Sequence, residues 1–194
     1  MPDFLVAGLG NPGPEYEWTY HNLGFLALDR LAERNGIRVS RKECRALVGA
    51  GKFGAAEVLL AKPQTFMNLS GESVKGLVEK YTLAPQQVVV IYDELDLPWA
   101  SVRVRPKGSD AGHNGMADII RCLGTQDVVR VRLGIDPGHP VRDGAKFVLT
   151  AMSGGQKKEL DEILDHAAGA VESIIAEGAE KAMTKYNRRA LGQE

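Results

Sequence analysis

The chain has 194 residues, of which 44% are hydrophobic, and its formal net charge is -1. This length and apolar content predict one globular domain spanning residues 1–194 and exclude a wholly disordered chain. The small net charge excludes a uniformly basic protein of the histone kind, although a local basic patch stays compatible with it.

Short apolar runs typical of β-strands alternate with helical patterns along the chain. The predicted strands are, in order, residues 4–9, 57–61, 88–92, 101–105 and 129–135. Helices are predicted from near Leu23 to a stop at Asn35-Gly36, from Ser70 as N-cap to about Thr82, from Met116 to Leu123 before Gly124, and as one or two helices over 155–182. This alternation predicts an α/β fold with a mostly parallel sheet.

The first predicted strand leads into Gly8-Leu9-Gly10-Asn11-Pro12-Gly13, which has the Gly-x-Gly-x-x-Gly spacing of dinucleotide-binding proteins. That motif needs a helix directly after the turn and an acidic residue at the end of the next strand. Prolines on both sides of Gly13 delay helix entry, and Asp29 and Glu33 fall inside a helical pattern. We therefore expect a stiff turn that presents the Asn11 amide, and no nucleotide cofactor.

Polar residues follow three of the predicted strands. Asn11 follows the first, residues 65–68 follow the second, and residues 93–96 (Asp93-Glu94-Leu95-Asp96) follow the third. Ligands of open α/β sheets bind outside the carboxyl ends of the strands, so these residues are expected to line one cleft. His21 precedes the first helix and has a plausible carboxylate partner in Asp93. Such a partner fixes the imidazole tautomer and raises the basicity of the other ring nitrogen, as a water-activating base requires.

Other routes to hydrolysis lack their sequence patterns. The chain contains no Gly-x-Ser-x-Gly nucleophile elbow and no His-Glu-x-x-His or paired Cys/His ligand set. We therefore expect direct attack by water, with neither a covalent intermediate nor a metal. The segment Gly112-His113-Asn114-Gly115 also carries polar side chains, but structural roles can explain both of them. Asn114 can cap the following helix, and His113 can pack beside that helix.

Arginines alternate with apolar residues in two predicted strands, at Arg103 and Arg105 and at Arg130 and Arg132. A period of two places them on one face of each strand. A solvated face explains the alternation, whereas the choice of Arg at all four positions favours a phosphate-bearing ligand such as a nucleic acid backbone. A second basic stretch, residues 38–52, either adds to such a basic surface or is simply solvated. Its basic residues are Arg38, Arg41, Lys42, Arg45 and Lys52.

The two cysteines, Cys44 and Cys122, lack Cys-x-x-Cys spacing and are too few to staple a secreted scaffold of this length. We expect buried free thiols. No apolar run approaches the ~20 residues of a membrane helix, and no leader pattern is present at the N-terminus. These features predict a cytoplasmic protein without a membrane partner.

Five segments in this order resemble the bacterial-type peptidyl-tRNA hydrolase family. They are residues 8–13 with Tyr16, residues 19–22 (TYHN), residues 62–71 (KPQTFMNLSG), residues 93–98 (DELDLP) and residues 112–115 (GHNG). The resemblance implies a three-layer fold of the phosphorylase-like kind, with helices flanking a twisted, mixed and mostly parallel sheet. It also implies a monomer that hydrolyses the ester joining peptide to the 3′ end of tRNA, which recycles tRNA from stalled translation.

The resemblance also assigns roles to individual residues. His21 matches the family's base, Asp93 the residue that stabilises it, and Asn11 the position that discriminates blocked from free aminoacyl-tRNA. The implied substrate-binding positions are Tyr16, Phe66, Met67, Asn68, His113 and Asn114, with Arg103 and Arg132 placed to clamp a tRNA phosphate. Either Asn68 or Asn114 is expected to donate to the developing oxyanion.

Two positions depart from the family pattern. Tyr20 stands where the family usually has Arg before the catalytic His, and Asp110 stands where glycine or a small residue is common. The alternative function is that of a non-catalytic RNA-binding relative with the same fold, similar to certain chloroplast splicing factors. Joint retention of five residues favours the enzyme, namely His21, Asp93, Asn11, Asn68 and Asn114.

Overall fold

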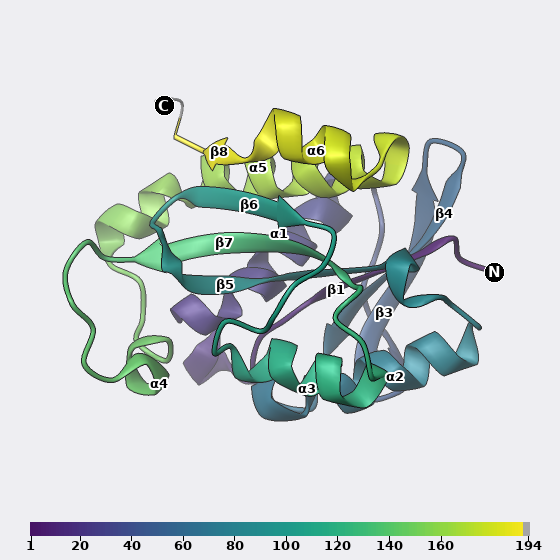
Figure 1. Cartoon of the computed structure of the whole chain (residues 1–194), viewed down its shortest axis with the longest axis horizontal. Coiled ribbons are helices and arrows are strands. Elements are labelled where there is room, and N and C mark those ends of the chain that lie inside the picture. Colours follow the sequence, from purple (N-terminus) through teal and green to yellow (C-terminus); the bar gives the residue numbers. More distant parts are fainter. Residues whose placement is uncertain (192–194) are drawn as a thin grey trace.

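Eight strands form one twisted sheet, and helices cover both of its faces (Figure 1). The computed structural model describes residues 1–191 of the chain. Across the sheet the strands follow the order β2-β3-β4-β1-β5-β7-β6-β8. Their bounds are Phe4–Gly8 (β1), Arg41–Glu43 (β2), Ala46–Phe53 (β3), Ala56–Pro63 (β4), Val88–Pro98 (β5), Ser101–Arg105 (β6), Val129–Asp136 (β7) and Arg188–Arg189 (β8).

The centre of the sheet is parallel, as the alternation of strands and helices predicts. Strand β1 lies between β4 and β5, and β7 follows β5 in the same direction. The strands on both flanks pair antiparallel. The sheet is therefore mixed, and the carboxyl ends of β1, β4 and β5 meet at one edge, where a ligand site is expected.

The helices form two layers around the sheet. The α-helices are Leu23–Arg34 (α1), Ser70–Lys80 (α2), Asn114–Leu123 (α3), Gly144–Phe147 (α4), Gly154–Glu177 (α5) and Ala179–Tyr186 (α6). Short 3-10 turns occupy Pro14–Tyr16 (η1), Tyr20–Asn22 (η2), Met67–Leu69 (η3) and Pro85–Gln87 (η4). One core lies between the sheet and α1, α5 and α6, and a second lies beneath α2 and α3. Alternate residues of β1 serve both cores, with Val6 in the first and Leu5 and Ala7 in the second.

The glycine-rich segment that begins at the end of β1 allows this strand to pack closely against α1. A Cβ atom at Gly8 would lie 2.3 Å from the carbonyl oxygen of Gly24 in α1, so the strand and the helix approach too closely for a side chain. The chain passes through η1 and η2 before α1 begins at Leu23. The turn is therefore not followed by the helix N-terminus that a bound pyrophosphate requires.

One of the predicted helix caps is present in the structure, and two are not. Gly124 adopts a left-handed conformation (φ 72°) directly after α3, as predicted for a C-cap. The N-cap prediction for Ser70 is wrong, because its hydroxyl donates to the carbonyl of Met67 and Asp118 of α3 accepts the N–H of Gly71 instead. The cap of α3 is also not Asn114. The ring of His113 accepts the N–H of Met116 there.

The antiparallel hairpin of β2 and β3 was not predicted. Its turn uses Cys44 (φ 48°) and Arg45 (φ 60°), two residues that seldom adopt positive φ, so the Asn-Gly type of turn signal is missing. Part of the second basic stretch forms ion pairs at this edge, since Arg41 pairs with Glu43 and Arg45 with Glu72.

Both cysteines are free thiols, as predicted, but they are half-buried rather than buried. Among residues 1–191, no helix combines the length and the apolar character needed to cross a membrane.

Candidate active site

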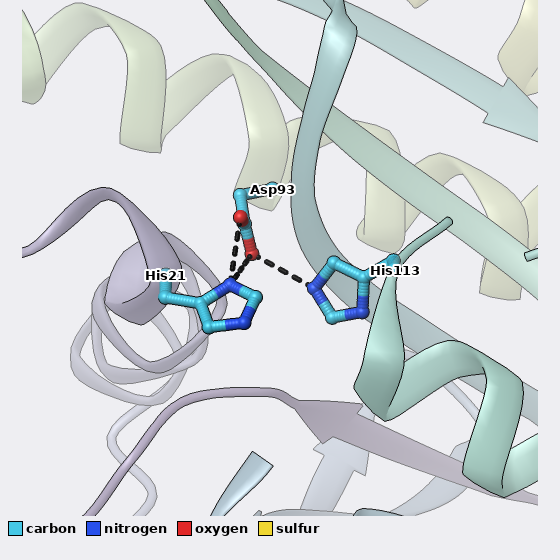
Figure 2. A group of neighbouring side chains, drawn as sticks. All are labelled: His21, Asp93 and His113. Carbon is cyan, nitrogen blue, oxygen red and sulfur yellow. Dashed lines mark hydrogen bonds and ion pairs between the residues drawn. The ribbon is translucent and has the colours of Figure 1, made fainter. Parts of the chain in front are cut away.

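The site is built around the carboxylate of Asp93, which lies buried in β5 between two imidazole rings (Figure 2). Nδ1 of His21, from η2, lies 2.8 Å from Oδ2 of Asp93. Nε2 of His113, from the loop before α3, lies 2.9 Å from Oδ1. The predicted pairing of His21 with Asp93 is therefore present, and His113 is a second partner that the sequence did not indicate.

The hydrogen bonds fix the tautomer of each ring. Nδ1 of His113 accepts the backbone N–H of Met116, so its proton resides on Nε2, which donates to Asp93. Nδ1 of His21 donates to the same carboxylate, and its Nε2 points away from Asp93 (Figure 2). Burial raises the pKa of the Asp93 carboxyl, but electrostatic contacts and hydrogen bonds with His113 and His21 outweigh burial and hold that pKa well below its usual range. The arrangement leaves His21 with one free basic nitrogen.

The same three residues are of the types that bind metal ions. Each offers one ligand atom, and these atoms lie within 4.8 Å of one another. Two ligands of one tetrahedral zinc ion at ~2.0–2.1 Å would be separated by roughly 3.3 Å. The N···O separations of 2.8 and 2.9 Å are those of direct hydrogen bonds. The donor set thus fits a histidine–carboxylate–histidine network better than it fits a metal centre.

A second network fixes the amide of Asn11. The side chain of Asn22 binds the Asn11 backbone at both ends, accepting its N–H (2.8 Å) and donating to its carbonyl (3.0 Å). Oδ1 of Asn11 accepts the N–H of Met67 at 2.7 Å. The amide oxygen is consequently occupied, and the NH₂ group of Asn11 is the part left to meet a ligand. Asn22 is a buried positioning residue that the sequence analysis did not single out.

One side of the site is a cavity of about 390 Å³, here called the aromatic cavity. Its lining includes seven predicted site residues: Asn11, Tyr16, His21, Phe66, Met67, Asn68 and Asn114. Phe66 is half exposed, stands edge-on to the ring of Tyr16 and has a φ of 64°, a strained backbone of the kind found at ligand sites. The amides of Asn68 and Asn114 are exposed.

The other side is a cavity of about 270 Å³, here called the acidic cavity, which shares His21 and Asn114 with the first. Asp93, Glu94 and Asp96 contribute carboxyl groups to its lining. Glu94 is buried, and burial raises its pKa to about 7 against the lowering effect of Arg132, with further raising by Asp96 and Asp93. Glu94 belongs to the polar strand end that was expected to face the cleft, although no role was predicted for it.

The four strand arginines share one face of the sheet, as predicted, because Arg103 is in register with Arg132 and Arg105 with Arg130. A third, basic cavity is lined by Arg105, Lys107, Arg130 and Arg132. Nη1 of Arg132 lies 3.4 Å from Oε1 of Glu94. The buried Nε of Arg132 lacks a hydrogen-bond partner within the described chain. Arg103 instead donates to the carbonyl of Val102.

For Arg130, neither interpretation of the arginine pattern is correct. The residue is buried, and it donates to the carbonyls of Val128, Ser109 and Gln126. It therefore shapes the loop before α3. Asp110 has a related structural role, since its carboxylate accepts the N–H of Gly112 and its carbonyl that of His113.

The chain was compared with known proteins. A family model described as peptidyl-tRNA hydrolase matches residues 5–194. The peptidyl-tRNA hydrolase of Solibacter usitatus (strain Ellin6076) is 60% identical over 97% of this chain and 96% of its own length, and that of Koribacter versatilis (strain Ellin345) is 50% identical over 95% and 92%. The crystal structure of peptidyl-tRNA hydrolase from Acinetobacter baumannii matches with a TM-score of 0.89 at 32% identity and covers 98% of both chains. The chain therefore matches these proteins in both sequence and fold over nearly its whole length.

Proposed function

Because the chain belongs to the peptidyl-tRNA hydrolase family and hydrolyses peptidyl-tRNA, we propose that His21 is the base of that reaction. The observation that carries this assignment is the geometry of its ring, with Nδ1 bound to Asp93 and Nε2 pointing away from it (Figure 2). The non-catalytic alternative is not favoured, since the curated relatives named above are hydrolases.

In the proposed mechanism, Nε2 of His21 takes a proton from water as the water attacks the ester carbonyl. A positioned base of this kind contributes roughly 10² to 10⁴ in rate. The carboxylate of Asp93 stabilises the imidazolium that forms, and His113 keeps that carboxylate in place. The proton then passes from His21 to the 3′ oxygen of the tRNA as the ester bond breaks. The products are a tRNA with a free 3′ hydroxyl and a peptide carboxylic acid, which loses its proton to solvent.

Selection of blocked substrates follows from the orientation of Asn11. Its NH₂ group donates hydrogen bonds, and an N-blocked aminoacyl group carries an amide carbonyl that accepts one. A free aminoacyl-tRNA carries an ammonium group, which offers donors alone and repels the Asn11 NH₂. The two hydrogen bonds between the Asn22 side chain and the Asn11 backbone hold this NH₂ group in position.

The remaining predicted residues serve binding and charge stabilisation. We assign Tyr16, Phe66 and Met67 to the walls that hold the peptidyl end, and the amide of Asn68 or Asn114 to the oxyanion, at about 10² to 10³ in rate for a well-placed donor. The ring nitrogens of His113 are occupied within the protein, so we assign it to orienting Asp93 rather than to binding substrate.

We place a tRNA phosphate at the basic cavity. Arg132 is favoured as the principal contact because it lines this cavity and lies in the central strand β7, and Arg105 and Lys107 add positive charge beside it. Arg103 lies in register with Arg132 on the same face and stays a proposed contributor. Arg forks bind phosphate oxygens in pairs, which suits this cavity.

The test of the proposed function is peptide release by the full chain from two substrates prepared on the same tRNA. One carries an N-acetylated amino acid and the other the free amino acid. We expect rapid release of the blocked amino acid and at least tenfold slower release of the free one. Binding of tRNA without release would contradict hydrolysis, and equal rates on both substrates would contradict the role of Asn11.

A further inference from the structure

We propose that Tyr20 is a positioning residue that fixes the segment of residues 144–150 against the catalytic histidine and so sets the shape of both substrate cavities. This proposal rests on the proposed function, because it assumes that the acidic and aromatic cavities hold the substrate. Three kinds of contact carry it: an aromatic stack, a side-chain hydrogen bond and two backbone hydrogen bonds.

The ring of Tyr20 is buried and contacts aromatic side chains from two distant segments. It stacks on Phe147, the last residue of α4, with ring centroids 4.7 Å apart and an interplanar angle of 13°. Trp99, which follows β5, lies edge-on to the Tyr20 ring, with ring centroids 6.2 Å apart. Aromatic pairs of this kind contribute beyond their buried area, so the stack anchors the end of α4.

The hydroxyl group of Tyr20 links this anchor to α5. It donates to Oε1 of Gln156 at 2.7 Å, and the same oxygen accepts the backbone N–H of Ser153 in the capping box of α5. A single side chain therefore joins η2, the end of α4 and the start of α5. The Arg that is usual in the family at this position would lack a flat ring and a neutral hydroxyl.

Backbone bonds place the same segment directly beside the base. The N–H of Tyr20 donates to the carbonyl of Thr150 at 3.2 Å, and the N–H of His21 donates to the carbonyl of Val148 at 2.8 Å. The amide protons of residues 20 and 21 are therefore protected while the segment is docked. Ala145 and Val148 of this segment line both the acidic and the aromatic cavity.

The segment has little intrinsic stability of its own. Helix α4 has four residues, and its Ala145 and Lys146 are exposed. A helix this short does not persist in water without tertiary contacts. The Tyr20 anchor thus decides where the cavity wall formed by Ala145 and Val148 lies, whereas the contacts among His21, Asp93 and His113 involve other atoms.

Two variants of the full chain test the proposal from both ends of the stack, Tyr20→Leu and Phe147→Leu. We expect each to raise KM for N-acetylated aminoacyl-tRNA about tenfold while kcat stays within a factor of about three and its pH profile is unchanged. Tyr20→Phe keeps the ring and should restore most of the lost binding. Phe53→Leu, at a buried aromatic of β3 away from the site, is the matched control and should leave KM unchanged.

Hydrogen exchange without substrate separates this proposal from the proposed function. In Tyr20→Leu and Phe147→Leu, we expect faster exchange at the amides of residues 20 and 21 and within 144–150, with the rest of the chain as in the wild type. Unchanged exchange in both variants would overturn the anchor. Faster exchange with an unchanged KM would overturn its effect on binding. Loss of kcat by more than tenfold with normal KM would place Tyr20 in the chemistry instead.

Discussion

Nε2 of His113 donates to Oδ1 of Asp93 at 2.9 Å, so the carboxylate that binds His21, the proposed base, is itself held by a second histidine. The sequence placed His113 next to a helix start but gave no sign of this contact. The bond matters because a carboxylate bound at both oxygens has little freedom to rotate away from His21.

His113→Ala should lower kcat about 10- to 100-fold with little effect on KM, since a buried hydrogen bond to a charged group is worth about 1.5–3 kcal/mol. Steady-state kinetics on N-acetylated aminoacyl-tRNA measure this. The matched control is His139→Ala, because His139 is exposed and outside the cavities. A rise in KM with constant kcat would mean that His113 binds substrate, as first predicted.

Asn11→Asp should lower the preference for blocked over free aminoacyl-tRNA at least tenfold, or about 1.4 kcal/mol. The new carboxylate can still accept the Met67 N–H, so the local fold is kept, but its other oxygen attracts the free ammonium group. The ratio of kcat/KM for the two substrates measures the change. A ratio equal to that of the wild type would remove Asn11 from substrate selection.

Glu94→Gln should make the protein more stable relative to the wild type as the pH rises. Burial raises the pKa of Glu94 from 4.5 to about 7, so between these values the folded chain binds more protons than the unfolded chain. The stability contributed by neutral Glu94 is present below pH 4.5 and is lost as the pH rises through 7.

Urea unfolding of the wild type and Glu94→Gln at pH 5 and pH 8 measures this effect. We expect the difference in the free energy of unfolding to shift in favour of the variant by roughly 1–3 kcal/mol between the two pH values. Any effect of the substitution on the contact with Arg132 that is the same at both pH values cancels when the two differences are compared. A difference independent of pH would show that Glu94 does not change protonation in this range.

Arg132→Ala should weaken tRNA binding and reduce the slope of log affinity against log salt by about one, as expected for one lost phosphate contact. Binding titrations with deacylated tRNA at several salt concentrations measure the slope. Lys181→Ala removes an exposed positive charge from α6, in the other helix layer, and serves as the control. An unchanged slope for Arg132→Ala would move the phosphate contact away from the basic cavity.

Much of the site could be predicted because it depends on strand ends. The parallel run of β4, β1 and β5 follows from three apolar stretches, and their carboxyl ends bring Asn11, Met67 and Asp93 together. The contact between His21 and Asp93 joins residues 72 positions apart, yet the sheet geometry was sufficient to suggest it.

The rest depends on contacts that residue patterns do not encode. Asn22 binds the main chain of Asn11, and Arg130 uses its guanidinium on loop carbonyls although the strand pattern favoured a solvent or ligand face. The β2–β3 turn has positive φ at Cys44 and Arg45 without a glycine. In each case, the contact or conformation exists only in the folded chain, and no pattern of residue types marks it.

The most direct test of the account is the single-turnover rate of ester cleavage by His21→Gln at saturating enzyme, with tRNA binding measured separately. Glutamine keeps the polarity of the site but cannot act as a base. We predict a fall of at least about 10² in the cleavage rate with binding unchanged within a factor of about two. A cleavage rate equal to that of the wild type would contradict the assignment of His21 as the base.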